Sequence, residues 1–266
     1  MGHFLSKENA VHESPALQMR AIVRVVGKAV PVTAAAHISP DIFEKAIKST
    51  PFHDWCSSMD PKLAVQSVTI TDVDMFGPRV GFLKFKADVS FQGKAVPGVV
   101  FMRGGAVAIL LVLKCGNERY VVCTRQPRVP VGMSNMLELP AGMLDGSGNF
   151  AGVAAKELEE ETGIKLHFSD LVDMTDLAYK NTALRGMYPS PGGSDEFIRL
   201  FYTTISVVEE TLKSLQGKAT GNYKEGENIV LQLVPFKDLW RSTADSKALS
   251  SLALLNGLAE TGLLRT

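Results

Sequence analysis

Residues Leu137–Ile164 read LELPAGMLDGSGNFAGVAAKELEEETGI, and this stretch decides the fold. The order of residues predicts the end of a strand, a glycine-rich loop and one short acidic helix. Asn149 has a side chain that caps helix starts, and Gly163 can end a helix because glycine adopts positive φ without strain. We therefore expect a helix between these two positions.

Three glutamates of this helix fall on one face. At about 100° per residue, Glu157, Glu160 and Glu161 share an arc roughly 100° wide. Small residues and one leucine fill the adjoining arc, which suits close packing on a sheet. Like charges on adjacent turns repel one another. The face is therefore either a solvated acidic surface or a cluster of the hard oxygen ligands that Mg²⁺ prefers.

The whole stretch resembles the Nudix box, G-x5-E-x7-R-E-U-x-E-E-x-G-U, in which U is a bulky aliphatic residue. The matching positions are Gly142, Glu157, Leu158, Glu160, Glu161, Gly163 and Ile164. Gly148 stands where the box has glutamate, and Lys156 stands where it has arginine. In the family these two positions commonly pair and brace the loop against the helix. Because both partners are replaced, no orphan charge remains, and Lys156 can still pair with Glu160 four residues on. We interpret the change as structural drift without loss of catalysis.

The resemblance implies a fold and a metal site. The fold is of the α+β class, an α/β/α sandwich preceded by a small β-rich domain. The metal is Mg²⁺, with Mn²⁺ as a substitute, bound by the helix glutamates Glu157, Glu160 and Glu161. The family's further ligand is the backbone carbonyl before the first glycine of the box, and Ala141 occupies that place.

A second motif lies about 35 residues beyond the helix, in YPSPGGSDE at positions 188–196. Its prolines and glycines predict a rigid turn before a strand at 197–205. The motif resembles the S-P-G…E loop of the ADP-ribose and ADP-sugar pyrophosphatases of the Nudix superfamily. That resemblance implies that Glu196 orients or deprotonates the attacking water, with Asp195 as its alternative. Ser190 and Asp195 are expected to contact the substrate.

Two arginines lie where the chain leaves a predicted hairpin strand at 118–125. Arg125 and Arg128 are either surface charges or contacts for the phosphates or ribose of the substrate. The planar, five-donor guanidinium suits a diphosphate.

The runs DMFGPRVGFLKFKADV, VPGVVFMRGGAVAIL and MLELPAGMLD extend the resemblance over nearly the whole folded chain, and they are most similar to plant-type ADP-sugar diphosphatases. This implies Mg²⁺-dependent hydrolysis of ADP-ribose or ADP-glucose to AMP and a sugar phosphate. Two alternatives stay open. One is a Nudix pyrophosphatase for another nucleotide derivative, such as a UDP-sugar, NADH or coenzyme A. The other is a non-catalytic binding protein, motivated by Gly148 and Lys156.

The chain of 266 residues is long enough for two domains. We expect an N-terminal extension at 1–36, flexible or targeting, a β-rich dimerisation and substrate domain at 37–97, and a Nudix domain at 98–266. In the second segment Ser39 and Pro40 predict a helix start and Pro51 its end, while Gln92-Gly93 predicts a hairpin turn. Residues 165–180 are expected to return to a strand, 229–234 to form another, and 236–264 to form an amphipathic helix.

Net charge is zero at a pI of about 7.0, so the charge gives no indication of nucleic acid or a membrane surface as a partner. The three cysteines suit a reducing compartment, and the expected location is the cytoplasm, or an organelle if residues 1–36 are a targeting sequence. By resemblance we expect a homodimer that acts on a small nucleotide sugar. Phe82 and Phe85 are expected in the core, with stacking on a purine as the alternative.

Overall fold

The computed structural model describes residues 19–144, 149–221 and 228–265, which form two compact units divided between Met102 and Arg103. Gly148, named in the box motif above, lies outside these residues. The division falls five residues beyond the expected boundary at 97/98. The reason is that β6 (Val99–Met102) pairs with a strand of the first unit.

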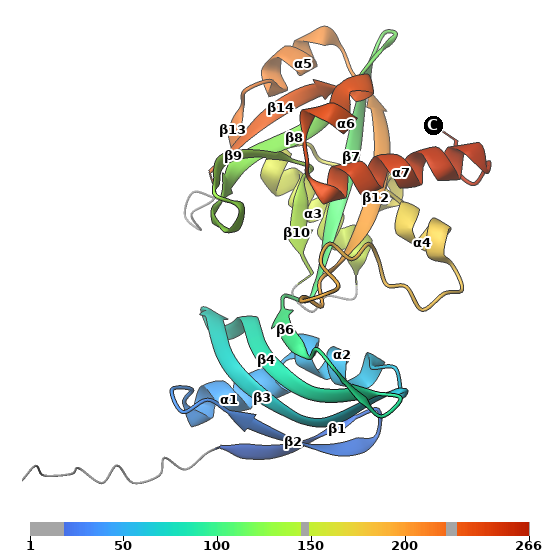
Figure 1. The fold of residues 1–266 in the computed structure, drawn as a ribbon. Coiled ribbons are helices and arrows are strands. Elements are labelled where there is room, and N and C mark those ends of the chain that lie inside the picture. Colours follow the sequence, from blue (N-terminus) through green and yellow to red (C-terminus); the bar gives the residue numbers. More distant parts are fainter. Residues whose placement is uncertain (1–18, 145–148, 222–227, 266) are drawn as a thin grey trace, which may run out of the picture. The chain divides into compact units, whose positions relative to one another are not determined.

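The first unit is a six-stranded sheet with two helices. Its strand order is β1-β2-β3-β4-β5, with β6 on β4, and every pair is antiparallel except β2 with β3. Its elements are β1 (Arg20–Val25), β2 (Lys28–Ala34), α1 (Pro40–Lys48), α2 (Thr50–Ser58), β3 (Leu63–Phe76), β4 (Arg79–Phe91), β5 (Lys94–Val96) and β6 (Figure 1). The helices connect β2 to β3, as a parallel pair requires. Their buried faces share one core with the sheet.

Three expectations for this unit are corrected or refined. The expectation of an extension through residue 36 is wrong for 20–34, because this run alternates inward and outward side chains and pairs as β1 and β2. Pro51 does not end the first helix, which stops at Lys48, but lies in the first turn of α2. Phe85 is 1% exposed in the core, whereas Phe82 lies on the opposite face of β4 and contacts the ring of Phe101.

The second unit is built on a mixed eight-stranded sheet. The strand order is β11-β12-β7-β8-β14-β13, with β10 on β7 and β9 on β8. The strands are β7 (Gly105–Cys115), β8 (Glu118–Arg128), β9 (Met133–Glu138), β10 (Ala141–Met143), β11 (Val172–Asp173), β12 (Phe197–Ser206), β13 (Ala219–Thr220) and β14 (Ile229–Pro235). The central strand β7 is buried on both faces, which explains its continuous apolar run.

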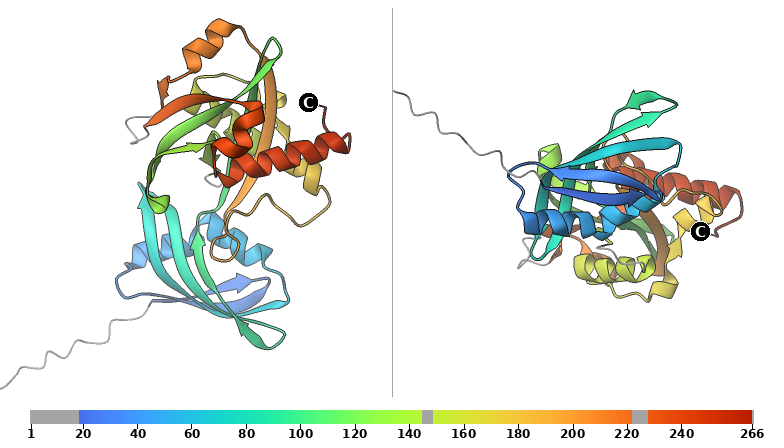
Figure 2. Two further views of the ribbon diagram at one scale, coloured as in Figure 1. Left: turned by 45° about the horizontal axis from the view of Figure 1, so that its top comes forward. Right: turned by 90° about the horizontal axis from the view of Figure 1, so that it is seen from below.

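Helices cover both faces of this sheet (Figures 1 and 2). The larger elements are α3 (Phe150–Thr162), α4 (Met174–Tyr179), α5 (Glu209–Leu215), α6 (Leu239–Ser242) and α7 (Ser246–Glu260). Alternate residues of β7 enter two separate cores, one with α3 and α5, the other with α4, α6 and α7. The expected α/β/α sandwich is confirmed.

Two segments of the second unit differ from expectation. The strand expected over 165–180 is only two residues long, and most of the segment forms a 3-10 turn at Phe168–Asp170 and α4. The helix expected at 236–264 is divided, because Asp245 caps a new helix start at α7 after α6 has ended. Among the described residues no helix is both long enough and apolar enough to cross a membrane.

Candidate active site

The acidic helix α3 forms where the sequence predicts it. The Asn149 side chain accepts a hydrogen bond from the Gly152 amide at 3.0 Å, which caps the start. Gly163 has φ +74° and donates its amide to the Glu159 carbonyl at 2.8 Å, which ends the helix. The expected bounds of the helix are confirmed.

Two of its glutamates lie against the backbone of β10. The Glu161 side chain is buried, with the residue 5% exposed, and accepts a hydrogen bond from the Ala141 amide at 3.1 Å. A Cβ atom on Gly142 would lie 2.0 Å from the carboxyl carbon of Glu157. Only glycine therefore lets the Glu157 carboxylate approach this strand, which gives the first glycine of the box a steric reason.

Glu160 points elsewhere. It is exposed and forms an ion pair with Lys156 at 3.3 Å on the same helix. Among the described residues no group of three or more histidine, cysteine, aspartate or glutamate side chains is arranged to hold a metal ion. The three helix glutamates are thus not gathered around one point in this structure. The assignment of Glu157, Glu160, Glu161 and Ala141 as metal ligands stays a prediction.

The turn before β12 holds the other expected acidic residues. Asp195 accepts hydrogen bonds from the backbone amides of Arg103 at 2.7 Å and Gly104 at 3.2 Å. Burial raises the pKa of Asp195, and these amides oppose the shift. Ser190 is exposed, and its carbonyl accepts hydrogen bonds from Gly193 and Ser194 within the turn. Asp195 therefore fastens this turn to the start of β7.

Glu196 forms an ion pair with Arg103, whose Nη1 lies 3.4 Å from Oε1. The Glu196 side chain is 14% exposed. Burial raises its pKa above the ordinary value, and the positive charges of Arg103, Lys247 and Arg128 act against that shift. The sequence reasoning missed Arg103. The available signal was a lone cation directly before the Gly-Gly that opens the buried strand.

The register of the sheet brings the two acidic segments to one end of β7. Ala106 of β7 pairs with Met143 on one side and with Ile198 on the other. Adjacent strands lie about 4.8 Å apart, so these two flanking positions are roughly 10 Å apart. Glu196 precedes Ile198 by two residues, and the glutamates of α3 contact the residues just before Met143.

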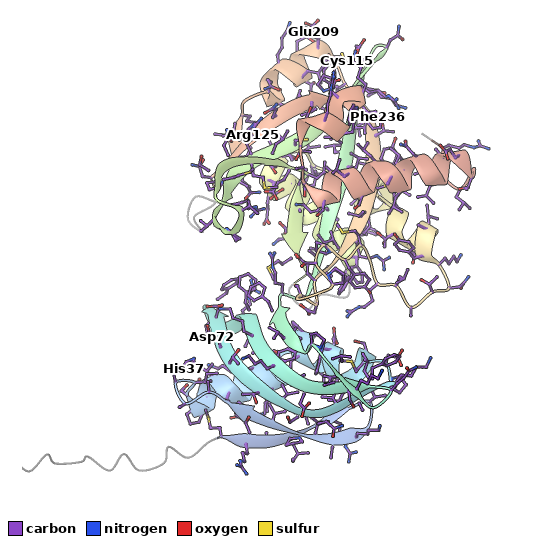
Figure 3. The ribbon with its side chains drawn as sticks, viewed as in Figure 1. His37, Asp72, Cys115, Arg125, Glu209 and Phe236 are labelled. Atoms are coloured by element: carbon purple, nitrogen blue, oxygen red, sulfur yellow. The ribbon has the colours of Figure 1, made fainter. Side chains whose placement is uncertain are left out.

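The two expected substrate-binding arginines both have protein partners. Arg125, labelled in Figure 3, bonds through Nε to the Gln232 side chain and through Nη1 to the Asn135 carbonyl at 3.1 Å. Arg128 donates Nε to the Glu138 carboxylate at 2.6 Å, and its side chain is 40% exposed. Arg128 is therefore held by a carboxylate through Nε, whereas Arg125 is held by two neutral oxygens.

A buried charge network extends from Arg128. The second oxygen of Glu138 accepts from Lys247 Nζ at 3.1 Å, and Lys247 also contacts Asp245 at 2.8 Å. The other oxygen of Asp245 accepts from the Leu139 amide at 3.1 Å. The start of α7 is thus tied to the segment that leads into β10, two residues before Ala141.

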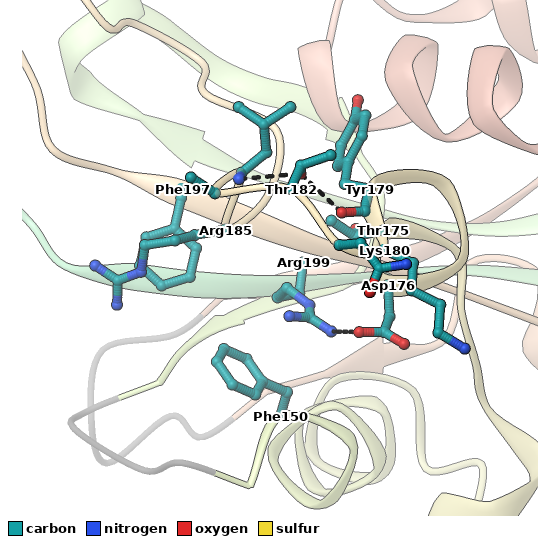
Figure 4. Close-up of a pocket in the computed structure, with 12 residues that line it drawn as sticks. Phe150, Thr175, Asp176, Tyr179, Lys180, Thr182, Arg185, Phe197 and Arg199 are labelled. Carbon is teal, nitrogen blue, oxygen red and sulfur yellow. Dashed lines mark hydrogen bonds and ion pairs between the residues drawn. The ribbon is translucent and has the colours of Figure 1, made fainter.

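A pocket of about 380 Å³ lies between α4, the start of α3 and the start of β12 (Figure 4). Its lining includes Phe150, Asp176, Lys180, Arg185 and Arg199. None of the site residues expected from the sequence lines it. The pocket is therefore separate from the group formed by Glu157, Glu161 and Glu196.

Comparisons with known proteins agree with this geometry. The family described as "NUDIX domain" matches residues 102–255. Nudix hydrolase 14, chloroplastic, of Arabidopsis thaliana is 46% identical over 243 residues, covering 87% of this chain and 78% of the relative. The ADP-ribose pyrophosphatase of Bacillus subtilis is 32% identical over 149 residues, covering 55% and 71%.

A solved structure supports the same fold. It is described as an ADP compounds hydrolase and aligns with a TM-score of 0.50 at 16% identity, covering 77% of this chain and 99% of that chain. At this identity the likeness shows the fold alone. The domain match and the identity to the Arabidopsis relative show the family, and the expected recognition is confirmed. The chain belongs to the Nudix family.

Proposed function

We propose that the protein is a metal-dependent diphosphatase that splits an ADP-sugar, either ADP-ribose or ADP-glucose, into AMP and a sugar phosphate. The observation that carries the proposal is the packing of the Glu157 and Glu161 carboxylates around the backbone of Ala141 and Gly142. Similarity to an ADP-ribose pyrophosphatase supports the substrate class. The family supports the type of reaction, because Nudix hydrolases generally use divalent metals.

The donors in this group suit a hard divalent cation, since all of them are oxygens. Glu157, Glu161 and the Ala141 carbonyl would hold Mg²⁺ or Mn²⁺, and Glu160 would join them by turning away from Lys156. Such a cation lowers the pKa of a bound water and neutralises charge on the phosphates. The steric cradle at Gly142 fits this assignment, because it keeps the Glu157 carboxylate next to the Ala141 peptide.

Glu196 is the proposed acceptor of the proton from the attacking water. The oxygen of that water forms a bond to phosphorus, the bond to the bridging oxygen breaks, and the proton passes to the carboxylate. Burial raises the pKa of Glu196, which makes its ionised form a stronger base. Arg103 holds this carboxylate in place, and Asp195 positions Arg103 by binding its amide.

The proposed substrate contacts differ in strength. Arg128 is the stronger candidate for a phosphate, because Glu138 fixes one edge of its guanidinium while the side chain stays partly exposed. Arg125 and Ser190 remain proposed contacts of lesser weight. Asp195 contributes through the backbone of Arg103 and Gly104.

The experiment is product analysis with ADP-ribose, ADP-glucose and UDP-glucose in parallel, with Mg²⁺. We expect AMP from the ADP-sugars. Glu161→Gln should lower kcat by about a hundredfold or more. Glu159→Gln is the matched control, because Glu159 lies on the same helix but is exposed and pairs with Lys165 at 3.1 Å. Near-normal turnover by a Glu161→Gln protein whose circular dichroism spectrum matches that of the wild type would contradict the metal assignment.

The same panel separates the alternatives. Preference for UDP-glucose, NADH or a coenzyme A derivative would support hydrolysis of a diphosphate bond but contradict ADP-sugars as the substrate class. Absence of Mg²⁺-dependent product from every compound would favour a binding protein without turnover. Glu196→Gln tests the base, and turnover near the wild-type rate would remove that role from Glu196.

We also propose a homodimer to which the first unit contributes the interface and part of the substrate site. The aromatic group Phe76, Phe82 and Phe101, on the sheet face opposite the core, offers rings for a nucleotide base. Light scattering after gel filtration tests the dimer. The chloroplastic relative supports an organellar location over the cytoplasm. A fluorescent fusion to residues 1–36 tests whether this segment directs import.

A further inference from the structure

The first residue of α3 makes a contact that bears on the two departures from the Nudix box. The family's brace between loop and helix needs a glutamate and an arginine, and this chain has Gly148 and Lys156 in those places. Glycine has no side chain to pair. The ion pair of Lys156 with Glu160 lies within α3 and cannot itself fasten the helix to the sheet.

Phe150 packs on a guanidinium of the neighbouring strand. The Arg199 Cζ atom lies 4.8 Å from the centre of the Phe150 ring, and Phe197 lies beside the same ring at 6.5 Å between centroids. Figure 4 shows Phe150 and Arg199 projecting toward each other from α3 and β12. A planar cation over an aromatic face is attractive, and more so where water is partly excluded.

Arg199 is held rigidly from its other side. Its Nε donates to the Asp173 carboxylate at 3.0 Å, Nη2 bonds to the same oxygen, and Nη2 lies 3.5 Å from Asp176. The Arg199 and Asp173 side chains are 19% and 21% exposed. Asp173 in turn caps the start of α4 by accepting from the Asp176 amide at 2.8 Å. The guanidinium therefore presents a fixed surface to Phe150.

The contact determines the rotation of the acidic helix. Phe150 and Glu157 are seven residues apart, close to two full turns, so they lie on the same face of α3. Arg199 and Gly142 both pair with Val107, from opposite sides of β7. Two contacts therefore hold α3 against the sheet at the level of Val107. One is Phe150 on Arg199, and the other is Glu157 against Gly142.

We infer that Phe150, Arg199 and Asp173 form a clasp that replaces the missing brace and positions the metal-binding face of α3. These are positioning residues, since they act on Glu157 and Glu161 through the helix. The inference rests on the proposed function for its effect on turnover. The clasp itself is a property of the folded chain and can be measured without substrate or metal.

The test uses Arg199→Met, Phe150→Leu and the double variant. Arg119→Met is the matched control, because Arg119 stacks on Phe236 at 4.4 Å, away from α3. In metal-free protein we expect hydrogen exchange of the amides of residues 153–158 to be roughly three- to tenfold faster in both clasp variants. The double variant should be no faster than the faster single one, since both remove the same contact. The control should leave these amides unchanged.

Two further measurements link the clasp to the site. Mn²⁺ affinity, measured by calorimetry, should fall several-fold in Arg199→Met and Phe150→Leu and be unchanged in Arg119→Met. Adding Gly148→Glu with Lys156→Arg to the Arg199 variant should restore slow exchange, because the family's brace is supplied again. Exchange in 153–158 that is unchanged in Phe150→Leu would overturn the inference, even if Arg199→Met fails to fold. A wild-type protein that splits no nucleotide sugar would overturn the proposed function and leave the exchange result standing.

Discussion

Each unit contains a lysine placed between two carboxylates, and the two clusters differ mainly in burial. In the first unit Lys84 lies 3.1 Å from Asp72 and 3.2 Å from Asp74, with side chains 40%, 46% and 47% exposed. In the second unit Lys247 lies 3.1 Å from Glu138 and 2.8 Å from Asp245, with side chains 12%, 6% and 3% exposed. The distances are nearly equal.

Distance alone therefore does not rank ion pairs by their contribution to stability. Exposed ion pairs contribute little to the free energy of unfolding, because water and salt screen the charges. A buried ion pair stabilises the fold little more than an apolar replacement would. Removing one partner, however, leaves the other charge buried and uncompensated, which is strongly destabilising. The Lys247 cluster has a further consequence, because Asp245 and Glu138 flank the segment that leads to Ala141. A substitution in this cluster should therefore affect the proposed metal site at Ala141.

The largest effect is expected for Lys247→Met. It leaves Asp245 buried without the cation that it contacts, while Glu138 keeps its ion pair with Arg128, and it should lower the free energy of unfolding by about 3–5 kcal/mol. Urea unfolding followed by circular dichroism measures the change in the second unit's transition. A shift no greater than that of Lys84→Met would show that burial does not govern these clusters.

A smaller effect is expected when all three charges are removed together. The variant Lys247→Met with Glu138→Gln and Asp245→Asn buries no unpaired charge, so its cost should fall to about 1–2 kcal/mol. The same urea experiment measures it. A cost equal to the sum of three separate single variants would mean that the side chains act independently, against the contacts seen.

The comparison also shows what a sequence can and cannot reveal. The bounds of α3 were predictable because the hydrogen bonds of Asn149 and Gly163 that begin and end the helix join residues only three or four positions apart. The partners of Lys247 and Glu196 were not, since Glu138 is 109 residues from Lys247 and Arg103 is 93 from Glu196. Such pairs depend on strand order, which a single sequence does not specify. The box motif located the glutamates, and the i,i+4 spacing of Lys156 and Glu160 predicted their ion pair, which is confirmed at 3.3 Å.

Arg103 and Glu196 form a pair of intermediate exposure, and its effect should appear in the pH dependence of activity. Burial raises the pKa of Glu196, so its ionised form, the proposed base, is lost as pH falls through a value above the ordinary one for glutamate. Arg103 favours the ionised form, and Arg103→Met should therefore move the acid limb of kcat/KM to higher pH. A pH–rate profile measures the shift. If the acid limb stays at the same pH in Arg103→Met, or is still present in Glu196→Gln, the limb reports the titration of another group.

The smallest effect is expected for the exposed cluster. Hydrogen bonding to Lys84 lowers the pKa of Asp72, so its contribution to stability is present above the ordinary aspartate pKa and is lost as pH falls through the lowered value. The bonds to Asp72 and Asp74 raise the pKa of Lys84, so its contribution is lost only as pH rises through that raised value. Because all three side chains are solvated, Lys84→Met should leave the urea midpoint at pH 7 and 0.15 M salt unchanged within error. Raising the salt to 1 M should then remove any remaining difference between Lys84→Met and wild type, while the difference caused by Lys247→Met should persist, because salt screens buried charges much less.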